Sequence, residues 1–328
     1  MFRAVLIYVF LTCTCWGEEV VENYRWPASY LGKQKIAVKS LDPSSLGTFG
    51  FETERFRFYS DTKLANADWR SIMIVCEGLR GAMESLPLDL VKSDEQASTR
   101  AVVRILSEEA TYHEAGGLEQ TVGTYHYREK QVLIWSRGLI EPDPDRARFR
   151  LSKSRQYDLL VHELVHQVTA KQFRRMPTWF SEGIAEYLAA AHHSPGQYSF
   201  RDPAAAIREH VKKYLGEVAK LDQFKIIPLK LLTSLDGHAW AQNTRDGEGH
   251  GPFLKYVSAV LLVHYFCHLD PERNRGEVVR KFLGALRDGQ PASRATVEQL
   301  LRGRSLKSIE GEIQQFWRGK GLRVEFRS

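Results

Sequence analysis

Cysteine is scarce in this chain: only four of its 328 residues carry a thiol. Two of these, Cys13 and Cys15, lie close to the N-terminus, and only Cys76 and Cys267 lie farther along. This small number excludes a scaffold that depends on several disulfides for its stability. Cys76 and Cys267 could form one disulfide in an oxidising compartment, but each lies in an apolar segment and could equally be a core residue.

The chain also lacks a hydrophobic run long enough to cross a bilayer. The apolar run at residues 4–16 is shorter than the roughly 20 residues that a spanning helix needs. With Arg3 before it and small residues after it, this stretch instead has the pattern of a signal peptide that is cleaved after Gly17. We therefore expect residues 1–17 to be removed and the protein to be secreted or periplasmic, without a stable membrane span. A retained N-terminal anchor is the less favoured alternative.

A strongly basic segment is missing as well. The chain has 46 Lys and Arg against 40 Asp and Glu, a formal net charge of +6, which falls to +5 when Arg3 leaves with the signal peptide. The two signs are interspersed along the sequence. Because proteins that bind nucleic acids usually cluster their basic residues, we expect no nucleic acid partner.

The apolar pattern that is present predicts an α+β fold. Residues 54–60 alternate as a strand does, residues 68–86 have the pattern of an amphipathic helix, and residues 99–107 predict a second strand. The segment TVGTYHYREKQVLIW at residues 121–135 predicts a hairpin at the edge of a small mixed or antiparallel sheet. From about residue 152 onward the pattern is mainly helical.

These patterns divide the chain into four parts. After the signal peptide comes a polar leader at residues 18–50, which we expect to be poorly ordered. Residues 51–270 are the expected catalytic domain, and residues 271–328 the expected helical C-terminal extension.

The stretch LVHELVHQ is the first motif that carries chemistry. His162 and His166 are four residues apart and therefore lie one turn apart on the same face of a helix. Both imidazoles can then reach one zinc ion at about 2.0–2.1 Å. We expect this helix to begin at Ser152 or Ser154 and to end before Pro177.

A second motif follows in the segment PTWFSEGIAEYLAA. It predicts another helix from about Thr178, with Glu182 and Glu186 four residues apart on one face. Their aromatic and apolar neighbours indicate that this face is partly buried, and a buried carboxylate needs a partner such as a cation. Two histidines and one glutamate are a known ligand set for catalytic zinc, which keeps its fourth position open. We therefore expect Zn²⁺ as the cofactor.

Together the two motifs resemble those of the gluzincin zinc metallopeptidases. HELVHQ followed by PTWFSEGIAEY is similar to the H-E-x-x-H helix and the W-L-N-E-G-F-A stretch of the aminopeptidase N branch, and the order of strand, helix, strand and hairpin is also similar. Within this group the chain looks like the secreted bacterial peptidase MA-like proteins. The resemblance covers roughly residues 50–270. It implies a small sheet followed by a mainly helical, thermolysin-like zinc-binding region.

The third metal ligand stays open between two glutamates. Glu186 lies twenty residues after His166, which is similar to the thermolysin spacing, whereas Glu182 lies only sixteen residues after it but in the E-G-x-A context of the aminopeptidase-like members. The family pattern E-x-x-x-D/E implies that the first acid binds zinc and the second accepts a hydrogen bond from a histidine ligand. We therefore predict that His162, His166 and Glu182 bind the metal and that Glu186 is this acceptor.

The resemblance also implies catalytic residues. Glu163, next to His162, is the expected general base that takes a proton from the attacking water. Gluzincins commonly stabilise the oxyanion with a Tyr or His from a later helix, and Tyr256 in FLKYVSAVLLVHYF is the candidate here. Its register relative to Ser258 departs from the family pattern, and a tyrosine that only packs against its neighbours is equally compatible. His264 and Tyr265 are weaker candidates.

The sequence thus predicts a zinc metallopeptidase that acts on peptide or protein substrates. The G-x-M-E-N loop of aminopeptidases is absent from the expected edge strand, which favours an endopeptidase over an aminopeptidase. Two alternatives stay open. One is a catalytically silent relative that binds zinc or peptides without cleaving them. The other is a secreted helical interaction protein without a metal, in which HELVH occurs by chance.

Overall fold

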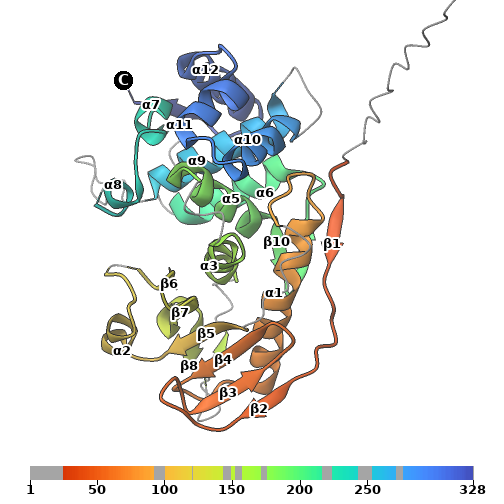
Figure 1. The fold of residues 1–328 in the computed structure, drawn as a ribbon, viewed down its shortest axis with the longest axis vertical. Coiled ribbons are helices and arrows are strands. Elements are labelled where there is room, and N and C mark those ends of the chain that lie inside the picture. The colour runs from red at the N-terminus through yellow and green to blue at the C-terminus, as the bar shows by residue number, and fades with distance from the viewer. Residues whose placement is uncertain are drawn as a thin grey trace, which may run out of the picture.

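The computed structural model of this protein describes residues 25–91, 100–119, 121–142, 149–151, 157–170, 176–215, 224–242, 253–270 and 276–327. Within these residues a sheet and a set of helices form one half of the molecule each (Figure 1), which confirms the predicted α+β class. The expected signal peptide at residues 1–17 lies outside the described residues. No helix of the described part is both long enough and apolar enough to cross a membrane.

The sheet is mixed and has six strands in the order β2-β3-β4-β5-β7-β6. The parallel pairs β4–β5 and β5–β7 lie in the middle, and antiparallel pairs lie on both sides of them. The strands are β2 (Lys39–Leu41), β3 (Phe49–Glu52), β4 (Phe56–Ser60), β5 (Ala101–Leu106), β6 (Gly123–His126) and β7 (Gln131–Trp135). The predicted hairpin is therefore present as β6 and β7, and β6 is an edge strand.

Helix α1 (Asn66–Glu84) connects β4 to β5, and the short helix α2 (Glu109–Glu114) follows β5. The buried face of α1 carries Ile72, Val75, Leu79 and Met83, which recur at helical spacing. Cys76 on the same helix is buried and free, and so is Cys267. Both cysteines are therefore core residues, and the disulfide that the sequence allowed is not formed.

The second half of the molecule is built mainly from helices, which lie above the sheet in Figure 1. They are α3 (Asp158–Val168), α5 (Thr178–Ala191), α6 (Pro203–Leu215), α7 (Leu229–Leu232), α8 (Gly237–Gln242), α9 (Leu254–His264) with its π-helical continuation η3 (Tyr265–Leu269), α10 (Glu277–Arg287), α11 (Ala292–Ala295) with its π-helical continuation η4 (Thr296–Leu301), and α12 (Leu306–Gly319). The remaining short elements are the 3-10 turn η1 (Ser136–Gly138) and the strands β1 (Ser29–Leu31), β8 (Ile140–Pro142), β9 (Phe149–Leu151), β10 (His192–Ser194), β11 (Gln197–Ser199), β12 (Phe224–Ile226) and β13 (Val324–Phe326).

Helix α3, which carries the HELVH motif, lies between the two halves (Figure 1) and packs on α1, α5 and the hairpin strands β6 and β7. Its apolar stripe, Leu160, Val161, Leu164 and Val165, is fully buried. The helix runs from Asp158 to Val168 and so ends before Pro177, and the expected start at Ser152 or Ser154 lies outside the described residues.

The expected polar leader needs correction. Residues 25–50 are part of the fold, since β1 pairs antiparallel with β11 and β2 pairs with β3, so a poorly ordered leader up to residue 50 is wrong for this stretch. The described residues 276–327 of the expected C-terminal extension are mainly helical and pack against the rest of the fold. Strand β13 pairs in parallel with β12, and Trp317 of α12 is fully buried in the main core.

Close packing of α5 against α9 fixes the position of the second motif. Gly183, next to Glu182, lies so near α9 that a Cβ atom would come within 2.6 Å of the Ala259 carbonyl oxygen and 2.7 Å of the Val263 side chain. The glycine is therefore needed for the approach of the two helices.

We expect Gly183→Ala to destabilise the protein by about 1–3 kcal/mol, because overpacking forces α5 and α9 apart. Gly311→Ala is the matched control, since Gly311 is exposed on α12 and nothing lies within 4 Å of an added Cβ. That change should stabilise the helix by up to about 1 kcal/mol. Urea denaturation measures both, and equal stability of the two variants would contradict this account of the α5–α9 contact.

Candidate metal centre

Helices α3 and α5 bring together the three residues that the sequence predicts as metal ligands. Nε2 of His162 lies 3.0 Å from Nε2 of His166. Oε2 of Glu182 lies 3.2 Å from the first of these nitrogens and 3.5 Å from the second. Three ligand atoms from two helices thus converge on one point, and within the described residues no other His, Cys, Asp and Glu side chains form such a group.

The spacing of these atoms fits a zinc ion. Four ligands placed tetrahedrally at about 2.0–2.1 Å from zinc are separated from one another by about 3.4 Å. The three distances here, 3.0, 3.2 and 3.5 Å, surround that value. Both imidazoles are buried, with His162 7% and His166 8% exposed, so water does not compete freely for their nitrogens. A tetrahedral ion bound here would keep its fourth position for a water or a substrate.

Glu186 lies on the other side of the His162 ring. Its Oε1 is 2.9 Å from Nδ1 of His162, so this nitrogen donates its hydrogen to the carboxylate and leaves the Nε2 lone pair for a metal. Because Glu186 contacts Nδ1, and the nitrogen that faces the other two ligands is Nε2, the Glu186 carboxylate is not in position to bind the same ion. The geometry therefore favours Glu182 over Glu186 as the third ligand, as the local sequence context predicts.

The second oxygen of Glu186 leads to a residue that the sequence analysis missed. Nε2 of His210, on α6, donates to Oε2 of Glu186 at 2.6 Å. Nδ1 of the same ring lies 3.7 Å from Oδ2 of Asp158 on α3, and Lys213 contacts this carboxylate at 3.4 Å. Asp158 precedes His162 by four residues and so shares its helix face. In the sequence, the position of Asp158 on the face of His162 is the feature that could have indicated a charged group next to the ligands.

Burial and charge act against each other throughout this cluster. Burial raises the pKa of Glu182, but His166 and His162 outweigh it and hold the pKa well below its usual range. Burial also raises the pKa of Glu186, yet His162 and His210 lower it to about 2. For His210 burial lowers the pKa, and the hydrogen bonds with Asp158 and Glu186 raise it to about 9. Both glutamates are thus carboxylates at neutral pH, which is the form that binds a metal or accepts a hydrogen bond.

Glu163 lies beside the three ligands and is not one of them. It is buried, with 7% of its surface exposed, and burial raises its pKa, while the charges of His162 and His166 offset part of this rise. Its carboxylate also interacts with the backbone of Tyr125 on the edge strand β6. The predicted general base therefore lies between the HELVH helix and the edge of the sheet.

Tyr256, the predicted oxyanion donor, is adjacent to the cluster. Its ring on α9 meets the ring of His162 edge-on, with the centroids 6.0 Å apart. Burial, assisted by the charge of Glu182, raises the pKa of Tyr256, so the hydroxyl keeps its proton. The two weaker candidates lie elsewhere: His264 packs against Trp317, and the Tyr265 hydroxyl donates to Glu312 at 2.5 Å.

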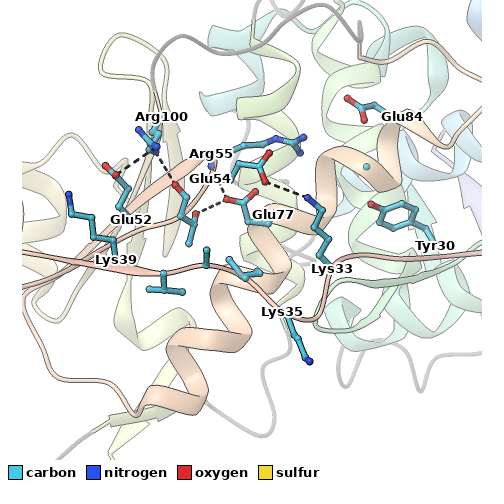
Figure 2. Close-up of a pocket in the computed structure, with 15 residues that line it drawn as sticks. Tyr30, Lys33, Lys35, Lys39, Glu52, Glu54, Arg55, Glu77, Glu84 and Arg100 are labelled. Carbon is cyan, nitrogen blue, oxygen red and sulfur yellow. Dashed lines mark hydrogen bonds and ion pairs between the residues drawn. The ribbon is translucent and has the colours of Figure 1, made fainter.

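A cavity of about 680 Å³ lies away from this cluster, between the N-terminal segment and α1 (Figure 2). Charged residues of both signs line it, and several of them pair with each other, such as Lys33 with Glu54 at 3.5 Å and Arg100 with Glu52 at 3.7 Å. None of the predicted ligands or catalytic residues lines this cavity. The predicted metal ligands on α3 and α5 therefore form a site separate from this cavity.

Comparison with known proteins adds no family assignment. A scan against protein-family models gives no match for this chain, and a search of curated proteins gives no significant match. The resemblance to gluzincins stays a prediction from the two motifs.

We expect Glu182→Ala to weaken zinc binding far more than Glu186→Ala. The first change removes a ligand, whereas the second removes a hydrogen-bond acceptor of a ligand, which costs about 10–100-fold in affinity. Competition with a chromophoric chelator gives both dissociation constants. The reverse order would show that Glu186 is the ligand and that the thermolysin-like spacing applies.

Proposed function

We propose that this protein is a secreted or periplasmic zinc metallopeptidase that hydrolyses peptide bonds. The observation that carries the proposal is the convergence of His162, His166 and Glu182 at the spacing of a tetrahedral zinc site. Glu163, buried beside this point, supplies the acid–base group that hydrolysis needs.

Zinc at this site would lower the pKa of a water in its open position toward about 7 and polarise a substrate carbonyl. The residues of the chain supply the proton transfers. Glu163 takes a proton from the attacking water and passes it to the leaving amine. Its raised pKa suits both steps, because a carboxylate that is too acidic holds a proton poorly.

The edge strand β6 offers a place for the substrate backbone. The Trp135 N–H donates to the Val122 carbonyl at 2.8 Å, and hydrogen-bonded pairs alternate along an antiparallel ladder. The N–H and C=O groups of Gly123 and Tyr125 therefore point away from β7, on the side where the Tyr125 backbone meets the Glu163 carboxylate. An extended peptide can pair with this edge as an added strand and so place its carbonyl near Glu163.

Gly123 itself serves the packing of the site. A Cβ atom at this position would come within 2.9 Å of the Leu159 side chain on α3. The glycine lets the edge strand lie close to the HELVH helix, which brings a bound peptide close to the metal ligands.

In this proposal Tyr256 stabilises the oxyanion that forms when water adds to the peptide carbonyl. Its raised pKa keeps the proton on the hydroxyl, and its ring meets the ring of the ligand His162. A neutral O–H donor in a buried site stabilises a developing negative charge more strongly than it would in water.

We expect Glu163→Gln to retain zinc and to lose cleavage of a mixed peptide library by a factor of about 10² to 10⁴, because the amide cannot accept the proton of the water. Zinc content and cleavage are measured on the same preparation. A variant that cleaves as fast as the wild type would exclude Glu163 as the base. Zinc without cleavage in the wild type would favour the catalytically silent relative, and a wild type without zinc would favour the metal-free interaction protein.

We expect Tyr256→Phe to lower kcat by about 10² to 10³ and to leave zinc affinity unchanged, because it removes one donor to the oxyanion. Tyr265→Phe is the matched control, since that hydroxyl bonds Glu312 away from the metal ligands. Steady-state kinetics on one cleaved peptide tests both variants. Equal kcat values for the two would assign Tyr256 a packing role only.

A further inference from the structure

Four ionisable side chains form a closed ring across three helices next to the proposed metal site. Starting at His162 on α3, the ring passes through Glu186 on α5 and His210 on α6, and returns to α3 at Asp158. His162 and Asp158 are one helical turn apart. The ring therefore links the ligand helix α3 to α5 and α6 through side chains as well as through core packing.

We propose that His210 is a positioning residue that fixes Glu186, and through Glu186 the ring of His162, in the orientation that binds the metal. This inference rests on the proposed metal site and goes beyond it, because His210 is not one of the predicted metal ligands or catalytic residues.

The two oxygens of Glu186 have one imidazole partner each. Oε1 is 2.9 Å from Nδ1 of His162, and Oε2 is 2.6 Å from Nε2 of His210. A carboxylate held at both oxygens cannot rotate without breaking one of these contacts. The direction of the His162 Nδ1–H bond, and with it the direction of the Nε2 lone pair, is therefore set by where His210 lies.

Glu186 and His210 are both shielded from bulk solvent. Glu186 is 4% exposed and His210 is 3% exposed. Removal of the imidazole would leave Oε2 as a buried charged acceptor that has lost its donor, which is an expensive state in a low-dielectric interior. The carboxylate would relieve it by rotation or by taking up a proton, and either change weakens its hold on His162.

His210 is in turn held from its other side. Asp158 lies 3.7 Å from Nδ1 of His210, and Lys213, one turn farther along α6, lies 3.4 Å from Asp158. Charges of alternating sign therefore follow one another from Lys213 to Glu186. This order of charges keeps the Nε2–H of His210 directed at Glu186. Glu186 in turn orients the metal ligand His162.

The test compares Zn²⁺ affinity and the Co²⁺ absorption spectrum of the full-length protein and three variants. His210→Leu removes the donor to Glu186, and His210→Gln keeps an amide N–H near the place of Nε2. His264→Leu is the matched control, since His264 is also a buried imidazole, 2% exposed, but packs against Phe316 and Trp317. The visible absorption bands of bound Co²⁺ report the geometry of its ligands. A general loss of protein stability does not shift these bands.

We expect His210→Leu to raise the dissociation constant for Zn²⁺ by about tenfold or more, as loss of an outer hydrogen-bond partner does. Its Co²⁺ bands should shift, His210→Gln should restore part of both properties, and His264→Leu should match the wild type. If His210→Leu does not fold, His210→Gln and Asp158→Asn decide the matter, and each should bind Zn²⁺ more weakly with shifted Co²⁺ bands.

The inference is overturned if the His210 variants that fold bind Zn²⁺ as tightly as the wild type with unchanged Co²⁺ bands. It is also overturned if His264→Leu changes both properties equally, because the effect is then one of general stability. These failures leave the proposed function intact, since a wild type that binds zinc and cleaves peptides is unaffected by them. Conversely, a wild type that binds zinc without cleaving peptides removes the proposed function only, and one that binds no metal removes both.

Discussion

Two enclosed carboxylates, the half-buried Glu182 and the buried Glu186, impose the constraint on which the rest of this structure depends. A carboxylate in a protein interior needs positive charge or hydrogen-bond donors around it. His162 and His166 on α3 and His210 on α6 meet this need, so three helices must lie side by side with their polar residues turned inward. Gly183 permits the approach of a fourth helix, α9, which carries Tyr256 to the same place.

The parts of the site that were predictable from the sequence depend on short-range spacing. Residues four apart on a helix share a face, and this rule alone places His162 beside His166 and Glu182 beside Glu186. The alternating pattern likewise located the hairpin of β6 and β7. His210 could not be found in this way. It lies on another helix, and only the three-dimensional packing of α6 against α5 brings it to Glu186.

Segments whose order depends on distant partners were also missed. The polar composition of residues 25–50 suggested a disordered leader, yet β1 pairs with β11, far along the chain. The composition of a segment indicates how much apolar area the segment can bury by itself. It does not show whether the segment will pair as a strand with a hairpin elsewhere in the chain. The helices of residues 276–327 were predicted, but the contacts that join them to the main core, through Trp317 of α12 and the pairing of β13 with β12, depend on distant partners that no local pattern predicts.

Every role proposed for this site depends on whether the convergent atoms of His162, His166 and Glu182 hold a metal ion. The most direct measurement is elemental analysis of the purified full-length protein, prepared without chelators. We expect about one zinc per chain, as for other sites with three protein ligands. A zinc content far below one per chain, unchanged after incubation with added Zn²⁺, would contradict it.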